Sequence, residues 1–216
     1  MNIDKIDNGL FKIRIPFEEI TTTVYIYVCE QGVAIIDSAT YSSDVDEYII
    51  PALDTMNIPY DDVKYLLLTH NHSDHAGGIR RLSENFPNAM LCTSFNIDLS
   101  NRIDLVDDKT IFGNLKAIYL PGHTEHSFGF YDTFTKTLLS GDCLQLDGIG
   151  KYRNGIKNFD RYIESVNKLK CIDINRIVAA HEYDPFGSTA VGKRSVMRYL
   201  NKCNEIAKEK IKRLHC

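Results

Sequence analysis

Several features that would assign this chain to a particular class of protein are missing from its 216 residues. It has no run of about 18 apolar residues, which excludes a transmembrane helix. Its first residues, Met1–Asp7, are acidic and mixed, and they lack the basic start and apolar core of a signal peptide. Repeats, low-complexity tracts and linkers are absent as well. We therefore expect a cytoplasmic protein that has no membrane partner.

Paired cysteines and an excess of positive charge are also missing. The six cysteines are scattered and form no Cys-x-x-Cys pair. A disulfide framework is unexpected in a chain of this length without a secretion signal, so we expect most of them, including Cys143, to be small apolar fillers. The net charge of −4 does not favour nonspecific binding to nucleic acid.

The composition that remains is that of an ordinary globular protein, with 44% hydrophobic and 25% charged residues. We expect a single domain over residues 1–216, large enough to bury a sizeable core. It should end in a basic helix at about residues 193–214. That helix either supplies cations to an acidic substrate or is simply a solvated face. Its basic residues are Lys193, Arg194, Arg198, Lys202, Lys208, Lys210, Lys212 and Arg213.

Short apolar runs and helical patterns follow one another along the chain. A polar start at Ser42–Asp44 predicts a helix in which Pro51 makes a kink, and further helices are expected over 79–86, around 163–169 and over 196–214. Strands followed by a helix, and then strands followed by a helix again, occur twice along the chain. This order predicts an α/β protein with two sheets packed face to face and helices outside. The expected strands are 9–15, 22–29, 33–36, 65–68, 89–93, 117–120, 128–131, 137–139 and 177–180.

Four potential metal ligands, His70, His72, Asp74 and His75, lie within six residues directly after an apolar strand. His70 and His72 are two residues apart, so both can face one metal from an extended segment. Asp74 and His75 lie at the turn into the next helix and can serve a second metal. The glycines that follow, at 77 and 78, allow close approach of the backbone.

Three later segments each place one further ligand, His123, Asp142 or His181, after a short strand. Chemistry at strand ends is the usual layout of an active site. The carboxylate of Asp142 has two oxygens and can bridge two ions. Imidazole and carboxylate ligands suit zinc, iron or manganese, and a thiolate cage is absent.

In this order the ligands resemble those of the metallo-β-lactamase superfamily, which carries an HxHxDH motif, a later histidine, a bridging aspartate and a final histidine. The resemblance extends from about Thr22 to His181 and implies a four-layered αββα sandwich. Asp37-Ser38 looks like the family's structural Asp-Thr-Gly turn, with Ala39 in place of glycine. By resemblance, the first metal is bound by His70, His72 and His123, the second by Asp74, His75 and His181, and Asp142 bridges the two.

Particular positions distinguish the branches of this superfamily. Asp142 stands where the best-known true β-lactamases have cysteine, and His72 stands where the diiron flavoproteins have glutamate. The segment 148–155 and His181-Glu182-Tyr183 resemble glyoxalase II, in which Lys151 and Tyr183 would contact the glutathione part of a thioester. Arg153 replaces a second contacting tyrosine, and the chain has one final helix instead of a helical domain, which argues against strict glutathione specificity. The candidate substrate-binding residues are Lys151, Arg153 and Tyr183.

The resemblance implies a hydrolase that uses two divalent metal ions, with zinc favoured and iron or manganese as alternatives. A hydroxide that bridges the ions would attack the carbonyl carbon of a small thioester or lactone, and hydroxyacyl-thioester hydrolysis is favoured. Asp74 would be the catalytic residue that orients the hydroxide and shuttles its proton. No protein nucleophile is needed, which agrees with the absence of a Gly-x-Ser-x-Gly elbow.

Other functions are weaker alternatives. A persulfide dioxygenase with a single iron shares much of the glyoxalase II scaffold. A nuclease of the superfamily normally carries a clamp domain, for which 216 residues leave no room. The full ligand set argues against a noncatalytic binding module. We expect a small-molecule substrate and no nucleic acid, and a homodimer is left open.

Overall fold

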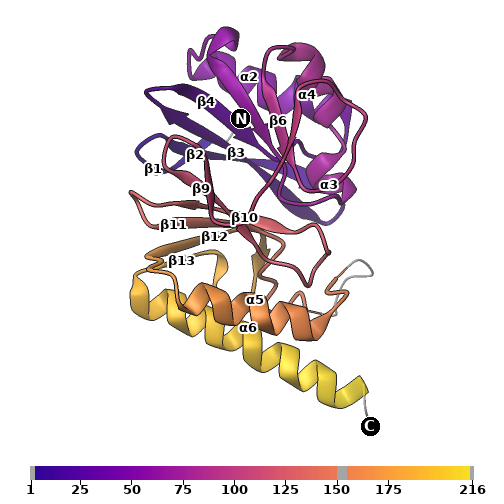
Figure 1. The fold of residues 1–216 in the computed structure, drawn as a ribbon, viewed down its shortest axis with the longest axis vertical. Helices are drawn as coiled ribbons and strands as arrows, with labels where there is room; N and C mark the ends of the chain where they lie inside the picture. Colours follow the sequence, from indigo (N-terminus) through magenta and orange to yellow (C-terminus); the bar gives the residue numbers. More distant parts are fainter. Residues whose placement is uncertain (1–2, 150–154, 215–216) are drawn as a thin grey trace. The chain divides into compact units, whose positions relative to one another are not determined.

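Two mixed β-sheets with flanking helices make up the computed structural model, which describes residues 3–149 and 155–214 (Figure 1). The chain divides into two compact units. Unit 1 contains the chain up to Leu105 together with Thr110–Gly113, and unit 2 contains Val106–Lys109 and the chain from Asn114 onward. The predicted class, an α/β protein with two mixed sheets and helices outside them, is confirmed.

The sheet of unit 1 has seven strands in the order β1-β2-β3-β4-β5-β6-β7. The first four strands pair antiparallel, and β4, β5, β6 and β7 pair parallel. Their bounds are β1 (Ile3–Asp7), β2 (Leu10–Phe17), β3 (Ile20–Cys29), β4 (Gly32–Ile36), β5 (Val63–Leu67), β6 (Met90–Thr93) and β7 (Arg102–Asp104).

Helical residues of unit 1 such as Val45, Leu53 and Leu82 pack in the same hydrophobic cluster as the sheet. The first helix begins at Ser42 as predicted, and the Asp44 carboxylate accepts hydrogen bonds from the backbone N–H groups of Thr40 and Tyr41. Pro51, which has no N–H, lies in the first turn of α2, directly after a π-helical turn. The elements are α1 (Ser42–Asp44), the π-helical turn η1 (Val45–Ile49), α2 (Ile50–Thr55), the 3-10 turn η2 (Tyr60–Asp62), α3 (Ser73–Ala76) and α4 (Ile79–Asn85).

The second sheet has six strands in the order β13-β12-β11-β10-β9-β8. The strands expected over 128–131 and 137–139 form the antiparallel pair β10 and β11, whereas β11 and β12 pair parallel. The bounds are β8 (Lys109–Phe112), β9 (Leu115–Tyr119), β10 (Phe128–Asp132), β11 (Thr137–Gly141), β12 (Arg176–Tyr183) and β13 (Gly187–Val191). The boundary between the two units falls within β8.

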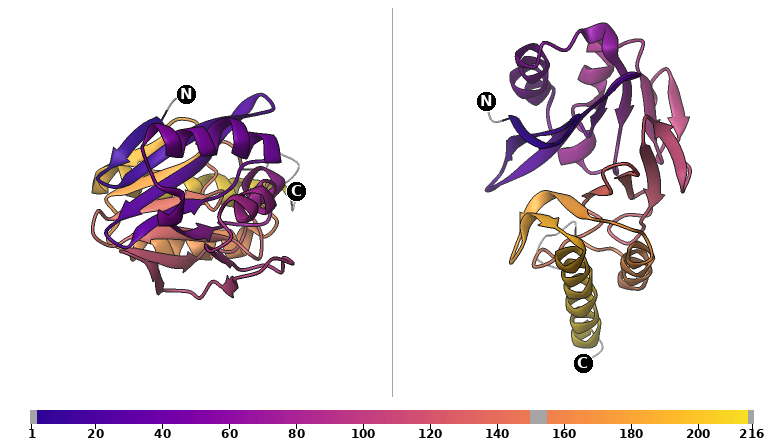
Figure 2. Two further views of the ribbon diagram at one scale, coloured as in Figure 1. Left: turned by 90° about the horizontal axis from the view of Figure 1, so that it is seen from above. Right: turned by 90° about the vertical axis from the view of Figure 1, so that its left-hand side faces the viewer.

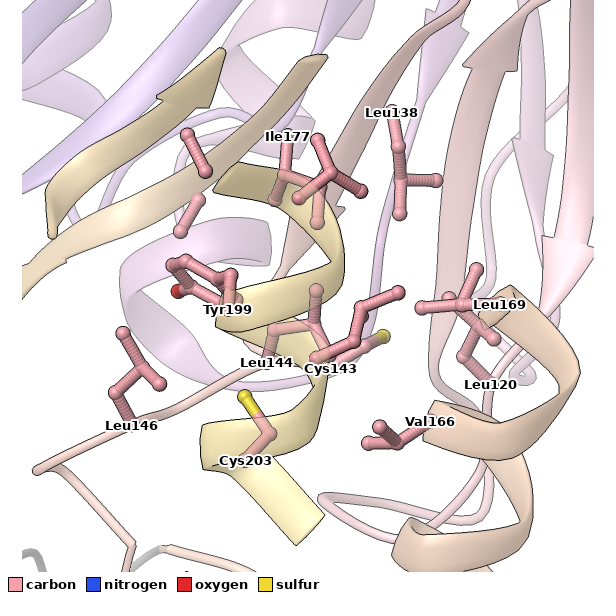
Figure 3. Packing of buried hydrophobic residues seen from close by; sticks show 14 of the residues in the cluster. Leu120, Leu138, Cys143, Leu144, Leu146, Val166, Leu169, Ile177, Tyr199 and Cys203 are labelled. Atoms are coloured by element: carbon pink, nitrogen blue, oxygen red, sulfur yellow. The ribbon is translucent and has the colours of Figure 1, made fainter. Parts of the chain in front are cut away.

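Two helices, α5 (Phe159–Lys170) and α6 (Lys193–Leu214), lie side by side on one face of the unit 2 sheet (Figure 2). The side chain of Asn158 caps α5 by accepting a hydrogen bond from the Arg161 N–H. Val166 and Leu169 of α5 and Tyr199 and Cys203 of α6 pack in one apolar cluster (Figure 3). Cys143 belongs to the same cluster and is 2% exposed, so its predicted role as an apolar filler is confirmed.

Two sequence-based expectations about strands were wrong. The strand expected over 177–180 continues through His181 to Tyr183, so this histidine lies within a strand and not after it. Four strands were not predicted at all: β1, β7, β8 and β13.

The five cysteines in the described ranges are free, and Cys216 lies outside them. No helix of the described chain has the length and apolar character needed to span a membrane.

Candidate metal centre

The histidine run lies at the end of a parallel strand of unit 1. Leu68 and Thr69 follow β5, His70 comes next, and His72 immediately precedes the first turn of α3. Asp74 and His75, which were expected at the turn into the next helix, lie inside this short helix. His70 and His75 are 1% and 0% exposed, Asp74 is 8% exposed, and His72 is half-buried. The three most buried ligands therefore need partners other than water.

Asp37, directly after β4, supplies one of those partners. Its carboxylate accepts hydrogen bonds from the backbone N–H of Thr69 at 2.8 Å and from the Thr69 hydroxyl at 2.9 Å. Nδ1 of His75 lies 2.7 Å from the Asp37 Oδ2. Because a carboxylate only accepts, the His75 proton is held on Nδ1 and Nε2 is left as the ligand atom.

The hydroxyl of Thr69 connects His70 to the Asp37 carboxylate. Its hydroxyl has one proton, which it donates to Asp37, and its oxygen lies 3.0 Å from Nδ1 of His70. The oxygen therefore accepts from His70 Nδ1–H, which again leaves Nε2 available as a ligand. Asp37 and Thr69 together thus select the same tautomer for both histidines.

The ligands of unit 1 also lie close to one another. Nε2 of His75 is 3.2 Å from an Asp74 carboxylate oxygen. The ring of His70 lies 4.7 Å from that of His72 and 4.2 Å from that of His75, measured between centroids. The hydroxyl of Thr22 donates to the Asp74 carbonyl and holds this turn. Unit 1 by itself thus offers three imidazoles and one carboxylate.

A close approach between two backbone segments fixes the position of α3. A Cβ atom on Gly77 would lie 1.9 Å from the Thr40 carbonyl oxygen, a distance at which only glycine fits. The backbone N–H and the hydroxyl of Ser38 donate to the His75 carbonyl at 2.7 and 2.9 Å. Asp37 and Ala39 have φ angles of 64° and 59°, so the turn that supports α3 has a left-handed backbone at both positions.

Unit 2 brings His123, Asp142 and His181 together from three places in its sheet. His123 lies in the loop after β9, Asp142 directly follows β11, and His181 is within β12. One oxygen of Asp142 lies 3.5 Å from Nε2 of His123, and the other lies 3.3 Å from Nε2 of His181. All three side chains are buried. A single carboxylate therefore faces a different histidine with each of its oxygens.

The loop that carries His123 is anchored on the first turn of α5. Gly122 has a φ of 138°, and a Cβ atom there would lie 2.5 Å from the Tyr162 Cα. Its carbonyl accepts from the backbone N–H groups of Lys157 and Asn158, each at 2.9 Å. Burial raises the pKa of the Tyr162 hydroxyl well above its usual value, so the hydroxyl stays neutral.

Gln145 is a residue of unit 2 that the sequence reasoning missed. Its amide nitrogen lies 3.1 Å from Nδ1 of His123 and 3.2 Å from an oxygen of Asp142. Its backbone N–H donates to the Tyr162 hydroxyl at 3.1 Å, and its side chain is buried. The available signal was a lone amide in the apolar run 143–146, three residues after a ligand.

The three predicted substrate contacts stay predictions. Lys151 and Arg153 lie outside the described residues. Tyr183 is 1% exposed, belongs to the apolar cluster of unit 2, and places its ring edge-on to His181 with the centroids 6.1 Å apart. The basic helix is present as expected, and its Arg194 and Arg198 line a surface pocket of about 750 Å³.

The donor set suits a divalent cation. Each of the seven residues offers an imidazole nitrogen or a carboxylate oxygen as a ligand atom. Asp74 and Asp142 are 8% and 6% exposed, and buried carboxylates are costly unless positive charge or hydrogen bonds compensate them. The described side chains could therefore hold metal, since imidazole and carboxylate groups are the donors that zinc, iron and manganese accept.

Similarity to known proteins agrees with this picture. Residues 18–92 match the metallo-beta-lactamase superfamily. Hydroxyacylglutathione hydrolase 1 of Vibrio vulnificus is 32% identical over 142 residues, which are 63% of this chain and 54% of that protein. Hydroxyacylglutathione hydrolase of Prochlorococcus marinus is 30% identical over 169 residues, which are 74% of this chain and 64% of that protein.

The chain thus spans between half and two thirds of the length of these two relatives. Among solved structures, a metallo-beta-lactamase of Cronobacter sakazakii superimposes with a TM-score of 0.76 at 16% identity, covering 100% of this chain and 90% of that one. At that identity the likeness establishes the fold alone. Taken together, the matches make the chain similar to the metallo-beta-lactamase superfamily over residues 18–92 and to hydroxyacylglutathione hydrolases at about 30% identity.

Proposed function

We propose that this protein is a dinuclear metal-dependent hydrolase that cleaves a small hydroxyacyl thioester. The observation that carries the proposal is Asp142, whose two oxygens each face a different histidine of unit 2. That arrangement is the one a carboxylate needs to bridge two ions. The named activity of the two relatives, hydroxyacylglutathione hydrolysis, supports the thioester.

The proposed ligands form two sets that Asp142 joins. His70, His72 and His123 bind the first ion, and Asp74, His75 and His181 bind the second. The outer nitrogens of His70 and His75 are already tied to Thr69 and Asp37, which leaves the inner nitrogens as ligands. Zinc is favoured, with iron or manganese as alternatives, because the donors are imidazole and carboxylate.

Two divalent ions bound there would acidify a water molecule and polarise the substrate carbonyl. Asp74 is the proposed catalytic residue. The proposed ligands include two buried carboxylates, and Asp74 is the one that does not bridge the ions. One of its oxygens lies 3.2 Å from Nε2 of His75. It orients the attacking water, accepts its proton, and returns that proton to the leaving thiolate. The C–S bond breaks as the new C–O bond forms, giving a carboxylic acid and a thiol.

The substrate is proposed to be a small molecule with an anionic thiol part. Lys151 and Arg153 would supply positive charge to that part, and Tyr183 would contact it. A small lactone has the same reactive carbonyl and remains within the proposal.

Metal analysis tests the proposed centre directly. Protein purified without added metal should contain two equivalents of a divalent ion. Asp142→Ala and His72→Ala should reduce the metal content and lower hydrolysis by more than about 100-fold, beyond the usual cost of substitutions outside the ligand shell. Asp46→Ala, a change at an exposed carboxylate that pairs with Arg81, is the matched control and should change neither. An Asp142→Ala protein with full metal content and full activity would refute the scheme.

A substrate panel tests the reaction. It should contain a hydroxyacylglutathione, a hydroxyacyl thioester of a small thiol without the peptide, and a lactone. Hydrolysis of either thioester supports the proposal, and the rate ratio between the two reports how far the glutathione part is recognised. Oxygen consumption with glutathione persulfide, together with no hydrolysis in the panel, would contradict it and favour the dioxygenase.

A further inference from the structure

The final helix of unit 2 carries two arginines without an acidic partner. Arg194 and Arg198 lie one turn apart in α6, and both are exposed. The first carboxylate of the helix, Glu205, accepts a hydrogen bond from Lys202 at 2.9 Å. Within residues 3–149 and 155–214, neither arginine forms an ion pair. The helix therefore presents two positive charges that no carboxylate of the described chain neutralises.

The guanidinium of Arg198 is held in place by an aromatic ring. Its Cζ lies 5.5 Å from the centroid of the Phe186 ring, in the geometry of a cation–π contact. The ring of Phe186 packs in turn on the buried ring of Tyr199, with the centroids 5.2 Å apart. The Phe186 N–H donates to the Tyr183 carbonyl at 3.0 Å. Because the cation is already positioned, a ligand that binds it pays less to order this side chain.

The same residues line the pocket of about 750 Å³ on α6, which we call the α6 pocket. A single water-sized ion needs only about 30 Å³, whereas pockets for organic ligands have volumes of about 300–1,000 Å³. The lining combines apolar side chains, from Pro185, Phe186 and Met197, with the basic side chains of Arg194 and Arg198. The α6 pocket therefore suits an organic anion that also has an apolar part.

The two arginines favour phosphate groups as the anionic part. A guanidinium is planar and binds a phosphate through two parallel hydrogen bonds. Arg194 and Arg198 are four residues apart, which places them about 6 Å apart along the helix axis. That spacing suits two phosphate groups on one ligand. The apolar lining suits a flat ring, so the class of ligand that fits best is a nucleoside with two phosphates.

The α6 pocket is joined to the candidate centre by a short piece of chain. Pro185 follows His181 by four residues, and both belong to unit 2. Four residues span at most about 14 Å even when fully extended, so this is an upper limit on the distance between the two Cα atoms. A molecule that has one end in the α6 pocket can therefore place its other end at the unit 2 ligands.

We propose that the α6 pocket binds the nucleotide end of a thiol whose acyl thioester this protein hydrolyses. Arg194 and Arg198 bind its phosphates, and the apolar lining contacts its ring. The inference rests on the proposed function and names the class of thiol that the substrate contains. It also assigns a binding role to two cations of the basic helix.

Direct binding tests the pocket without any hydrolysis. The probe is adenosine 3′,5′-bisphosphate, titrated into the whole protein by isothermal calorimetry. Arg194→Gln and Arg198→Gln should each weaken its binding by about 10-fold or more, since hydrogen bonds to charged groups are the stronger class. Arg213→Gln is the matched control, because Arg213 is an exposed arginine of the same helix that does not line the pocket, and it should bind as the wild type does.

Substrate kinetics test the link to the reaction. In the wild type, a hydroxyacyl thioester of coenzyme A, whose nucleotide end is this bisphosphate, should have a KM about 10-fold or more below that of the same acyl group on N-acetylcysteamine. Equal KM values for the two thioesters would show that the nucleotide end is not recognised.

Three binding results would overturn the inference. One is no binding of the bisphosphate to the wild type, and another is binding that neither Arg194→Gln nor Arg198→Gln weakens. The third is displacement of the bisphosphate equally well by inorganic phosphate or by glutathione, which would mean a site for a simple ion or for carboxylates. A protein that hydrolyses thioesters but binds no bisphosphate refutes this inference and leaves the proposed function standing. Binding through Arg198 without hydrolysis of any thioester refutes the proposed function instead.

Discussion

Nδ1 of His75 lies 2.7 Å from Oδ2 of Asp37, and both side chains are completely buried. Asp37 is not one of the seven proposed ligands, and it is 38 residues distant in sequence from His75. Its carboxylate nevertheless holds the imidazole by a charge-assisted hydrogen bond, the stronger class of such bonds. The orientation of this ligand is therefore determined by a residue at the end of a different strand.

Asp37→Asn should weaken metal binding about 10- to 100-fold, because an amide has one acceptor oxygen where the carboxylate has two. One of the two donors, Thr69 or His75, would then face an NH₂ group. Chelator competition measures the loss. Asp46→Asn, at an exposed carboxylate paired with Arg81, should bind metal as the wild type does. Wild-type affinity in Asp37→Asn would show that this carboxylate does not support the centre.

Gly77→Ala should destabilise the protein by more than about 3 kcal/mol, because the new methyl group would meet backbone that cannot move aside. Its Cβ would lie 1.9 Å from the Thr40 oxygen and 2.5 Å from the Ser73 oxygen. Urea unfolding monitored by circular dichroism gives the free energy. Gly187→Ala is the comparison, since nothing lies within 4 Å of a Cβ there and only its φ of +62° opposes the change. That variant should lose about 1–2 kcal/mol, and equal losses in both would contradict the steric explanation.

Asp107→Asn should reduce stability at neutral pH but not in acid. Burial raises the pKa of Asp107, but hydrogen bonds from Lys168 and from the Tyr119 N–H outweigh burial, and the pKa is lowered overall. A lowered carboxyl pKa stabilises the fold above the unfolded value of about 3.9, and this stabilisation is lost as the pH falls through the folded value.

The expected difference between wild type and Asp107→Asn is about 0.5–1 kcal/mol at neutral pH, because solvent screens a pair that is 37% and 46% exposed. Urea unfolding at a series of pH values from neutral to acid measures it. The difference should shrink as the pH falls below about 4. A constant difference across the series would mean that ionisation of Asp107 has no part in the effect.

The cysteines should differ sharply in reactivity. Burial raises the pKa of Cys92 and of Cys203 to about 12, so almost no reactive thiolate forms at either residue near neutral pH. Cys171 is exposed. Brief treatment of native protein with iodoacetamide should therefore label Cys171, and should label the two buried residues only after denaturation, as peptide mass spectrometry can show. Rapid native labelling of Cys203 would contradict its place in the core of unit 2.

The strands that the sequence predicted and those that it missed differ in their position within the sheets. β1 and β7 are the two edges of the seven-stranded sheet, and β13 and β8 are the two edges of the six-stranded sheet. All four unpredicted strands are edges. β7 and β8 carry mostly half-buried or exposed residues, so their sequences lack the apolar signature that periodicity detects. Pairing with a neighbouring strand, which is a tertiary interaction, makes them strands.

The residues of the candidate centre also differ in whether the sequence could reveal them. The proposed ligands could be recognised in the sequence because each lies at or near a strand and is of a residue type that can bind metal. Asp37 was recognised as part of a turn, but its bonds to Thr69 and His75 join residues that are 32 and 38 positions apart. Gln145 has a residue type with no metal-binding signature, so only its packing against His123 reveals it.

The hydroxyl of Thr69 has a further consequence for how the centre fills. Since Asp37 supports His75 directly and His70 through Thr69, one ligand from each proposed ion depends on a single carboxylate. Binding of a first ion would order this shared network, so a second ion would bind at a smaller cost in conformational entropy. Such binding would be positively cooperative. At less than two equivalents of Zn²⁺, we therefore expect empty and doubly loaded molecules to outnumber those that hold one ion.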